Sequence, residues 1–124
     1  MIAVQIAGRE FPLALTLDAM AELEQLSGEA FDGQGVVERI RDWHTLPGIV
    51  AVMAKHGGIL AGETVTEDET WFRQHIRMGE LPNVQRATLE AISDGMRMET
   101  EQAAPDESVD VVLEDLKKKE ATGG

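Results

Sequence analysis

The chain has no cysteine among its 124 residues. This absence excludes a disulfide framework, a thiolate metal site and a cysteine nucleophile, and it is compatible with the bacterial cytosol. No basic N-terminal segment is followed by an apolar core, so we expect no signal peptide. No apolar run approaches about 18 residues, the length of a membrane span. We therefore expect a soluble intracellular protein.

Basic residues are scarce: 11 Lys and Arg stand against 23 Asp and Glu, which gives a net charge of −12. Such a chain repels nucleic acid phosphates and anionic membranes, so we expect neither as a partner. An acidic surface can simply keep a small protein soluble. It can also bind basic or aggregation-prone protein segments, and charge alone does not separate these two interpretations.

Residue patterns typical of catalysis are missing as well. The three histidines, His44, His56 and His75, lack the i, i+4 spacing and the HExxH pattern of a zinc site. We expect His44 and His56 at helix ends, where the helix dipole suffices to explain His56. No serine lies in a G-x-S-x-G elbow, and no phosphate-binding loop is present. The chain is therefore expected to be no enzyme, with no catalytic residue, metal or cofactor.

Hydrophobic residues make up 43% of the sequence, an ordinary value for a globular domain with its own core. Near the N-terminus, apolar residues alternate with small or polar ones on both sides of residues 7–10. These apolar residues are Ile2, Val4, Ile6, Phe11, Leu13 and Leu15. Period-2 alternation around a Gly-containing break predicts a β-hairpin.

About five helices are expected after the hairpin. The first spans residues 16–28, because Thr16 is a good N-cap and Gly28 a natural stop. Its apolar stripe consists of Leu17, Met20, Ala21, Leu23 and Leu26. The second is expected from near Asp32 to Trp43, with the Trp43 side chain packed in the core.

The third helix is expected to restart at Thr45-Leu46-Pro47 and to end at Gly57-Gly58. It is apolar on most sides, which predicts a place at the centre of the domain. A capping box of Thr66 and Glu69 predicts the start of a fourth helix, which Gly79 ends. The last helix follows Leu81-Pro82-Asn83 and runs to about Met98. Its predicted inner face consists of Val84, Ala87, Ala91, Ile92 and Met96.

These elements predict an α+β, mostly α fold with one helical domain over residues 1–98. The composition from residue 99 on predicts a flexible acidic tail over residues 99–124. Within it, Val109, Val112, Leu113 and Leu116 follow i, i+3, i+4, i+7 spacing, which predicts a short amphipathic helix over 108–118. Two interpretations stay open: a frayed tail, or a helix that orders on contact with a partner or with its own domain.

Two stretches of the chain resemble a known family. The first is the hairpin ending Phe11-Pro12-Leu13-Ala14-Leu15-Thr16-Leu17, followed by Met20-Ala21-Glu22-Leu23-Glu24 and Leu26-Ser27-Gly28. The second is Ile49-Val50-Ala51-Val52-Met53-Ala54-Lys55-His56-Gly57-Gly58 with the capped helix after it. Both are similar to tail assembly chaperones of long-tailed bacteriophages, in the branch related to gene transfer agents. The resemblance covers residues 2–98 and rests on structural rather than catalytic motifs.

The resemblance implies a cytoplasmic chaperone that coats the long, helical tape measure protein while tail tube subunits polymerise around it. It implies the tape measure protein as a partner, the tail tube protein as a second candidate, and absence from the finished virion. Some members of the family also occur in a longer, frameshifted form. An apolar groove among the helices would bind the client. Val109, Val112, Leu113 and Leu116 would act as a secondary docking element or an internal plug.

Two other classes remain open. One is a structural tail or head-tail connection protein that is retained in the particle. The other is a small acidic regulatory or antitoxin-like protein that neutralises a basic partner. Self-association is also left open, because relatives of this type are often seen as homo-oligomers.

Overall fold

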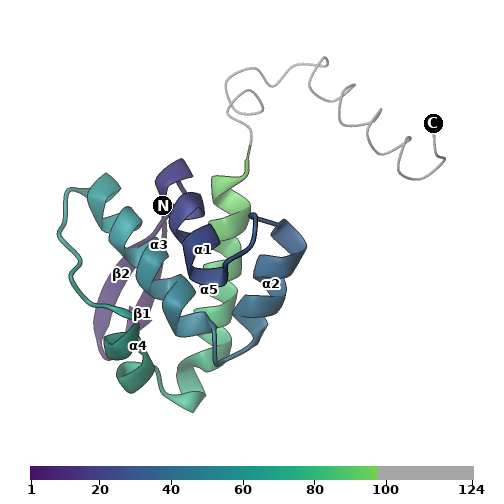
Figure 1. Ribbon diagram of the computed structural model, residues 1–124. Helices are drawn as coiled ribbons and strands as arrows, with labels where there is room; N and C mark the ends of the chain where they lie inside the picture. The colour runs from purple at the N-terminus through teal and green to yellow at the C-terminus, as the bar shows by residue number, and fades with distance from the viewer. Residues whose placement is uncertain (98–124) are drawn as a thin grey trace, which may run out of the picture.

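The computed structural model describes residues 1–97 (Figure 1). Its elements are β1 (Ile2–Ile6), β2 (Arg9–Leu13), α1 (Leu17–Ser27), α2 (Gly33–Arg41), α3 (Leu46–Ala61), α4 (Glu69–His75), the 3-10 helix η1 (Met78–Glu80) and α5 (Leu81–Gly95). The expected α+β fold, with an N-terminal hairpin followed by five helices, is confirmed. The tail predicted over residues 99–124 lies outside the described residues, as do Val109, Val112, Leu113 and Leu116.

The hairpin is closed by a two-residue loop, Ala7-Gly8, because Ile6 pairs with Arg9. Both loop residues have positive φ, 55° for Ala7 and 76° for Gly8. This combination is typical of a type I′ turn, whose twist matches that of the two strands. Alternation then points one face of the hairpin inward. Ile2 on this face is partly buried, and its other side chains are buried: Val4, Ile6, Phe11 and Leu13.

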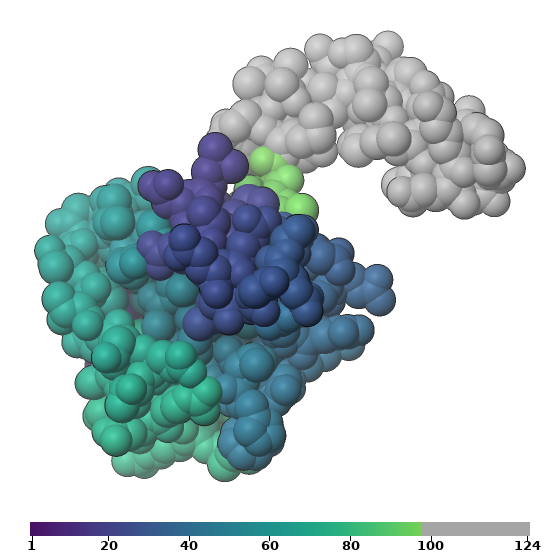
Figure 2. Space-filling view, in the orientation of Figure 1, coloured from purple at the N-terminus to yellow at the C-terminus, as the bar shows by residue number. Residues whose placement is uncertain are grey.

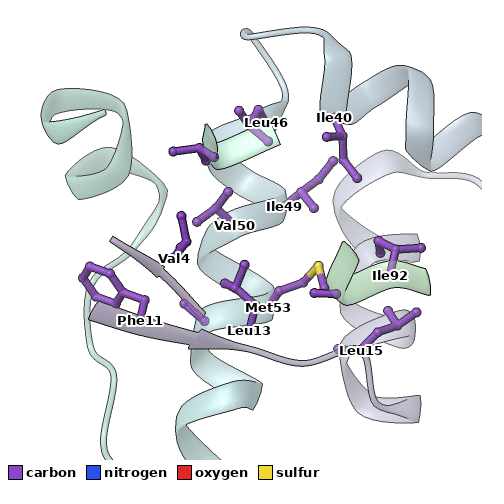
Figure 3. Packing of buried hydrophobic residues seen from close by; sticks show 14 of the residues in the cluster. Val4, Phe11, Leu13, Leu15, Ile40, Leu46, Ile49, Val50, Met53 and Ile92 are labelled. Carbon is purple, nitrogen blue, oxygen red and sulfur yellow. The ribbon is translucent and has the colours of Figure 1, made fainter. Parts of the chain in front are cut away.

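The central helix is α3, as its apolar sequence predicts. It contacts β2, α1, α2 and α4, while α5 packs against β1 and α2 (Figure 1). Figure 3 shows Val4 and Leu13 of the hairpin facing Val50 and Met53 of α3. The backbone N–H of Ala14 donates to the carbonyl of Met53 at 3.1 Å, which fixes the exit of the hairpin against α3.

The predicted end of the third helix at Gly57-Gly58 is wrong, since α3 runs on to Ala61 and ends at Gly62. The two glycines serve close packing instead of helix termination. A Cβ at Gly57 would lie 2.1 Å from the carbonyl oxygen of Pro12, and one at Gly58 would lie 2.7 Å from Val65 Cγ2. Their missing side chains let the hairpin and the segment after α3 approach the helix. His56 is therefore inside α3 and not at its C-terminus.

Several other predicted helix ends shift. Helix α2 stops at Arg41, because Asp42 leaves the helical conformation and its carboxylate accepts from the backbone N–H of His44 at 2.9 Å. The N-cap of α4 is Asp68, which accepts from the Trp71 N–H at 3.0 Å, so the predicted capping box is wrong. The predicted stop at Gly79 lies within η1, because α4 already ends at His75.

The last helix ends at Gly95 and not near Met98. A Cβ at Gly95 would lie 2.5 Å from Leu15 Cβ, so the end of α5 is pressed against the segment between the hairpin and α1. The chain turns away after this contact, and Met96 is exposed although its spacing predicts an inner position. Val84, Ala91 and Ile92 are buried as predicted.

Helix α1 begins and ends where the sequence predicts. Thr16 Oγ1 accepts from the Ala19 N–H at 3.1 Å, and Gly28 closes the helix in the left-handed region. Its buried face is narrower than predicted, since Leu17 is 84% exposed and Leu26 50% exposed. Only Ala19 and Leu23 of this helix are fully buried.

Candidate partner-binding groove

An open groove of about 210 Å³ lies between α1, α2, the start of α3, α4 and the loop after α1. Its floor is apolar, because Leu23, Val36 and Ile49 line it and belong to the buried core. Leu26 and Phe31 stand higher on the walls, with Leu26 half exposed and Phe31 partly buried. The groove therefore presents apolar surface to solvent on an otherwise strongly charged protein.

Gly48 lets two walls of the groove pack closely on the start of α3. A Cβ there would lie 3.0 Å from Leu26 Cδ2 and 3.3 Å from Glu69 Oε1. Gly48 thus sits between α1 and α4, where a larger side chain would press against Leu26 and Glu69. The missing side chain allows this close approach and so shapes the groove that these residues line.

Hydrogen bonds from backbone N–H groups to side chains fix the loop that forms one wall of the groove. Glu24 Oε2 accepts from the Phe31 N–H at 2.7 Å, and Ser27 Oγ accepts from the Glu29 N–H at 3.1 Å. Asp32 then caps α2 by accepting from the Gly35 N–H at 3.2 Å. These bonds satisfy backbone donors that neither helix supplies with a partner. The wall is therefore preformed before any partner binds.

Charged side chains of both signs form the rim. Arg39 Nη2 lies 3.2 Å from Glu29 Oε2. Arg73 donates to Glu69 Oε2 from Nε at 3.0 Å and from Nη2 at 2.7 Å, and it also donates to the carbonyl of His44. Exposed ion pairs of this kind add little stability. Their effect here is to surround an apolar floor with charges that can orient a bound segment.

A second, smaller hollow of about 110 Å³ lies next to the first, and Arg73 lines both. Trp43 and Met78 line this hollow, and they are 54% and 74% exposed. The Trp43 ring stacks on the ring of His44 at a centroid distance of 3.7 Å. The prediction that Trp43 packs in the core is therefore wrong, because α2 ends before it. Leu26, Trp43 and Met78 place exposed apolar surface on either side of Arg73.

The three histidines lie apart, each with its own partner. His44 Nδ1 is 2.8 Å from Asp42 Oδ1, and the backbone and side-chain hydrogen bonds from His44 lower the pKa of the Asp42 carboxyl. His75 Nδ1 lies 2.8 Å from the carbonyl of Trp71. Within residues 1–97 no three His, Cys, Asp or Glu side chains group in a way that could hold a metal ion.

The remaining histidine, His56, is buried in α3 and bonds to α1. Its Nε2 lies 2.9 Å from Glu22 Oε1, so this nitrogen carries the proton, because a carboxylate can only accept. Lys55 Nζ lies 2.7 Å from Glu22 Oε2. The hydrogen bonds from Lys55 and His56 outweigh partial burial and hold the pKa of Glu22 below its ordinary value of 4.5. The cluster is a polar tie between two helices.

Sequence reasoning predicted a groove among the helices but missed the residues that form it. Leu26 and Trp43 follow helical spacing and were expected in the core. No local signal distinguishes Leu26 from Leu23, which lies three residues earlier and is 5% exposed. The four candidate binding residues, Val109, Val112, Leu113 and Leu116, lie outside residues 1–97.

Comparison of the chain with protein-family models, with curated proteins and with solved structures finds no match. Among residues 1–97, no helix has the length and apolar character that a membrane crossing requires.

Proposed function

We propose that this chain is a phage or prophage tail assembly chaperone that binds the tape measure protein and keeps it soluble during tail tube assembly. The observation that carries the proposal is the preformed apolar groove around Leu26, with a rim of paired charges. The motif resemblance of residues 2–98 adds the identity of the client. On this proposal the protein acts by reversible binding in the host cytoplasm, without catalysis or a cofactor, and is absent from the mature virion.

The groove suits one helical segment of a client. Amphipathic helices bind grooves through apolar side chains at i, i+3, i+4 and i+7. Leu26 and the floor beneath it would receive the apolar face, and Trp43 and Met78 would extend the contact past Arg73. The rim acids Glu29 and Glu69 would meet basic residues of the client, in keeping with the net charge of −12.

Co-expression with the tape measure protein of the phage or prophage that encodes this chain tests the proposal. We expect the wild-type protein to raise the soluble fraction of that client several-fold. The double variant Leu26→Ser/Trp43→Ser should abolish most of this gain, because both side chains are exposed in the hollows. Leu17→Ser is the matched control: it makes the same change in the same helix, at a residue outside the groove. An unchanged client solubility with the wild-type protein would overturn the assignment.

A second variant probes the groove without adding a polar group. Gly48→Ala places a methyl group 3.0 Å from Leu26 Cδ2, so the Leu26 side chain must shift and the wall of the groove changes shape. We expect weaker client binding with little change in the fold, measured by pull-down and circular dichroism. If the Gly48→Ala protein and the Leu26→Ser/Trp43→Ser protein both bind the client as tightly as the wild type does, the client binds at another surface.

The electrostatic part of the proposal has its own test. Raising NaCl from about 50 to about 500 mM shortens the Debye length several-fold and should weaken binding to basic client fragments. Replacing rim acids, as in Glu29→Gln/Glu69→Gln, should have the same effect at low salt. If neither the added salt nor the loss of the rim acids weakens binding, charge plays no part in the mechanism. The proposal that the apolar groove binds the client would then still stand.

The alternatives predict other results. A structural tail or head-tail connection protein would be detected by mass spectrometry in purified particles. A regulatory or antitoxin-like protein would bind one small basic partner and leave the solubility of the long helical client unchanged.

A further inference from the structure

A second apolar surface lies at the opposite end of α1 from the groove. Five large side chains there are each more than half exposed: Met1, Leu17, Ile59, Leu60 and Met96. Figure 1 shows the N-terminus, the start of α1 and the end of α5 together at the top of the domain. We call these five residues the apolar end. Soluble domains seldom leave such surface uncovered without a use for it.

Contacts between the elements bring these residues to one end. Glu22 of α1 bonds to Lys55 and His56 of α3, and further along α1 Leu26 lies beside Gly48, so the two helices are antiparallel. The start of α1 lies one turn before Glu22. Ile59 and Leu60 lie one turn after Lys55 and His56. These two turns therefore adjoin.

The end of α5 and the N-terminus reach the same place. Gly95 lies against Leu15, so Met96 follows directly beside the segment that leads into Leu17. Met1 precedes Ile2, which pairs with Leu13 at the far end of the hairpin from its turn. Figure 2 shows the start of α1 next to the end of α5 on the surface.

The rest of the chain leaves from this end. Twelve positions after Arg97 comes Val109, the first residue of the apolar stripe that continues with Val112, Leu113 and Leu116. Eleven residues between them can span up to about 40 Å, which is more than enough to return to the apolar end. A linker of this length also gives an effective concentration in the millimolar range, roughly, so a weak contact suffices.

The charge at the apolar end complements that of this segment. Lys117, Lys118 and Lys119 follow the apolar stripe directly. Asp18 starts α1 beside Leu17, and Glu63 follows the C-cap of α3; neither has an ion-pair partner among residues 1–97.

We propose that residues 109–119 dock on the apolar end of their own domain, with Val109, Val112, Leu113 and Leu116 covering its apolar side chains and the three lysines facing Asp18 and Glu63. The segment acts as an intramolecular cover that keeps this surface from associating with other chains. It leaves the groove free, so this inference does not depend on which client the groove binds.

Disulfide trapping tests this docking, and the lack of native cysteine makes the experiment clean. The full-length double variant Ile59→Cys/Leu113→Cys joins the apolar end to the stripe. The matched control Leu26→Cys/Leu113→Cys joins the groove to the same stripe position, again from an exposed residue. Under mild oxidation we expect an intrachain disulfide in the first pair at a rate about tenfold above the second, because docking raises the local concentration of the two thiols.

Two further changes sharpen the result. Adding Val109→Ser and Val112→Ser to the Ile59→Cys/Leu113→Cys protein should lower its rate of disulfide formation towards that of the control. Adding Lys117→Gln/Lys118→Gln/Lys119→Gln to the same protein should also lower this rate at low salt. Equal rates for the two cysteine pairs, faster linking at the groove, or disulfides only between two chains would each overturn the proposal. The last result would mean that a second copy covers the apolar end.

Discussion

At the scale of single residues, the hairpin turn carries a conformational cost at Ala7. Its φ of 55° lies in the left-handed region, which non-glycine residues other than Asn and Asp enter at a cost of about 1 to 2 kcal/mol. The pairing of Ile6 with Arg9 imposes this conformation, because a two-residue loop of this type needs positive φ at both positions.

Ala7→Asn should therefore stabilise the protein by about 0.5 to 1 kcal/mol, since Asn tolerates this conformation better. Gly8→Ala should have the opposite effect and cost about 1 kcal/mol, although a Cβ there meets no atom within 4 Å. The two urea denaturation midpoints, compared with that of the wild type, check both signs. A destabilised Ala7→Asn protein would contradict the type I′ turn.

The hydrogen bonds that Glu22 of α1 accepts from Lys55 and His56 of α3 make the stability of the fold depend on pH. The hydrogen bond from Lys55 is the main cause that lowers the pKa of Glu22 in the folded state, with His56 adding to it. A carboxyl whose pKa is lower in the folded than in the unfolded state stabilises the fold above its unfolded pKa. This contribution is lost as the pH falls through the lower, folded pKa.

Glu22→Gln should thus lower the free energy of unfolding at pH 6 by about 0.5 to 1 kcal/mol, the range for partly exposed pairs. The difference from the wild type should shrink as the pH falls below 4.5, the ordinary value, and vanish once Glu22 is protonated in the folded state as well. Glu38→Gln is the control, because the Glu38 side chain makes no hydrogen bond or ion pair within residues 1–97. If the difference in unfolding free energy between Glu22→Gln and the wild type stays constant across this pH range, the Glu22 carboxylate does not stabilise the fold in this way.

At the scale of the elements, α3 organises the domain because two of its glycines admit neighbours to contact distance. The Pro12 carbonyl and the Val65 side chain occupy the places where Cβ atoms would stand at positions 57 and 58. The hairpin therefore packs on the backbone of α3, and the segment after Gly62 folds back along the same helix.

Gly57→Ala should destabilise the protein by about 3 kcal/mol, since the added methyl group meets backbone atoms that cannot move aside. Gly58→Ala should cost less, because Val65 can shift. Gly79→Ala is the control, with nothing within 4 Å of its Cβ, and should change stability by less than about 0.5 kcal/mol. Thermal midpoints of the three variants should fall in this order, with Gly57→Ala lowest; a Gly57→Ala protein as stable as the control would refute the close approach.

At the scale of the whole molecule, acidic residues outnumber basic ones by 12. Excess charge of one sign opposes compaction, and dissolved salt screens that repulsion. The urea midpoint at pH 7 should therefore rise when NaCl is increased from about 20 to about 300 mM, as the Debye length falls. A fall in the midpoint would show that ion pairs such as Arg39–Glu29 outweigh the net repulsion.

Leu23 and Leu26 show how far the candidate site could be predicted. Both lie on the apolar stripe of α1, and helical spacing gives them the same expected burial. Leu26 lies against Gly48, 22 positions along the chain, and lines the groove, where it stays half exposed. Trp43 differs from its expected place for a local reason, because Asp42 accepts a hydrogen bond from the His44 backbone N–H and α2 ends early.

The sequence by itself determined the features that depend on neighbouring residues. Alternation predicts the hairpin, although its loop is Ala7-Gly8 and not the whole of residues 7–10. Thr16 and Gly28 bound α1 as predicted, because their hydrogen bonds and backbone angles are local. Only the tertiary structure shows what Gly48, Gly57 and Gly58 do and that Leu26 stays half exposed. These outcomes depend on contacts between residues far apart in the chain, which no local pattern encodes.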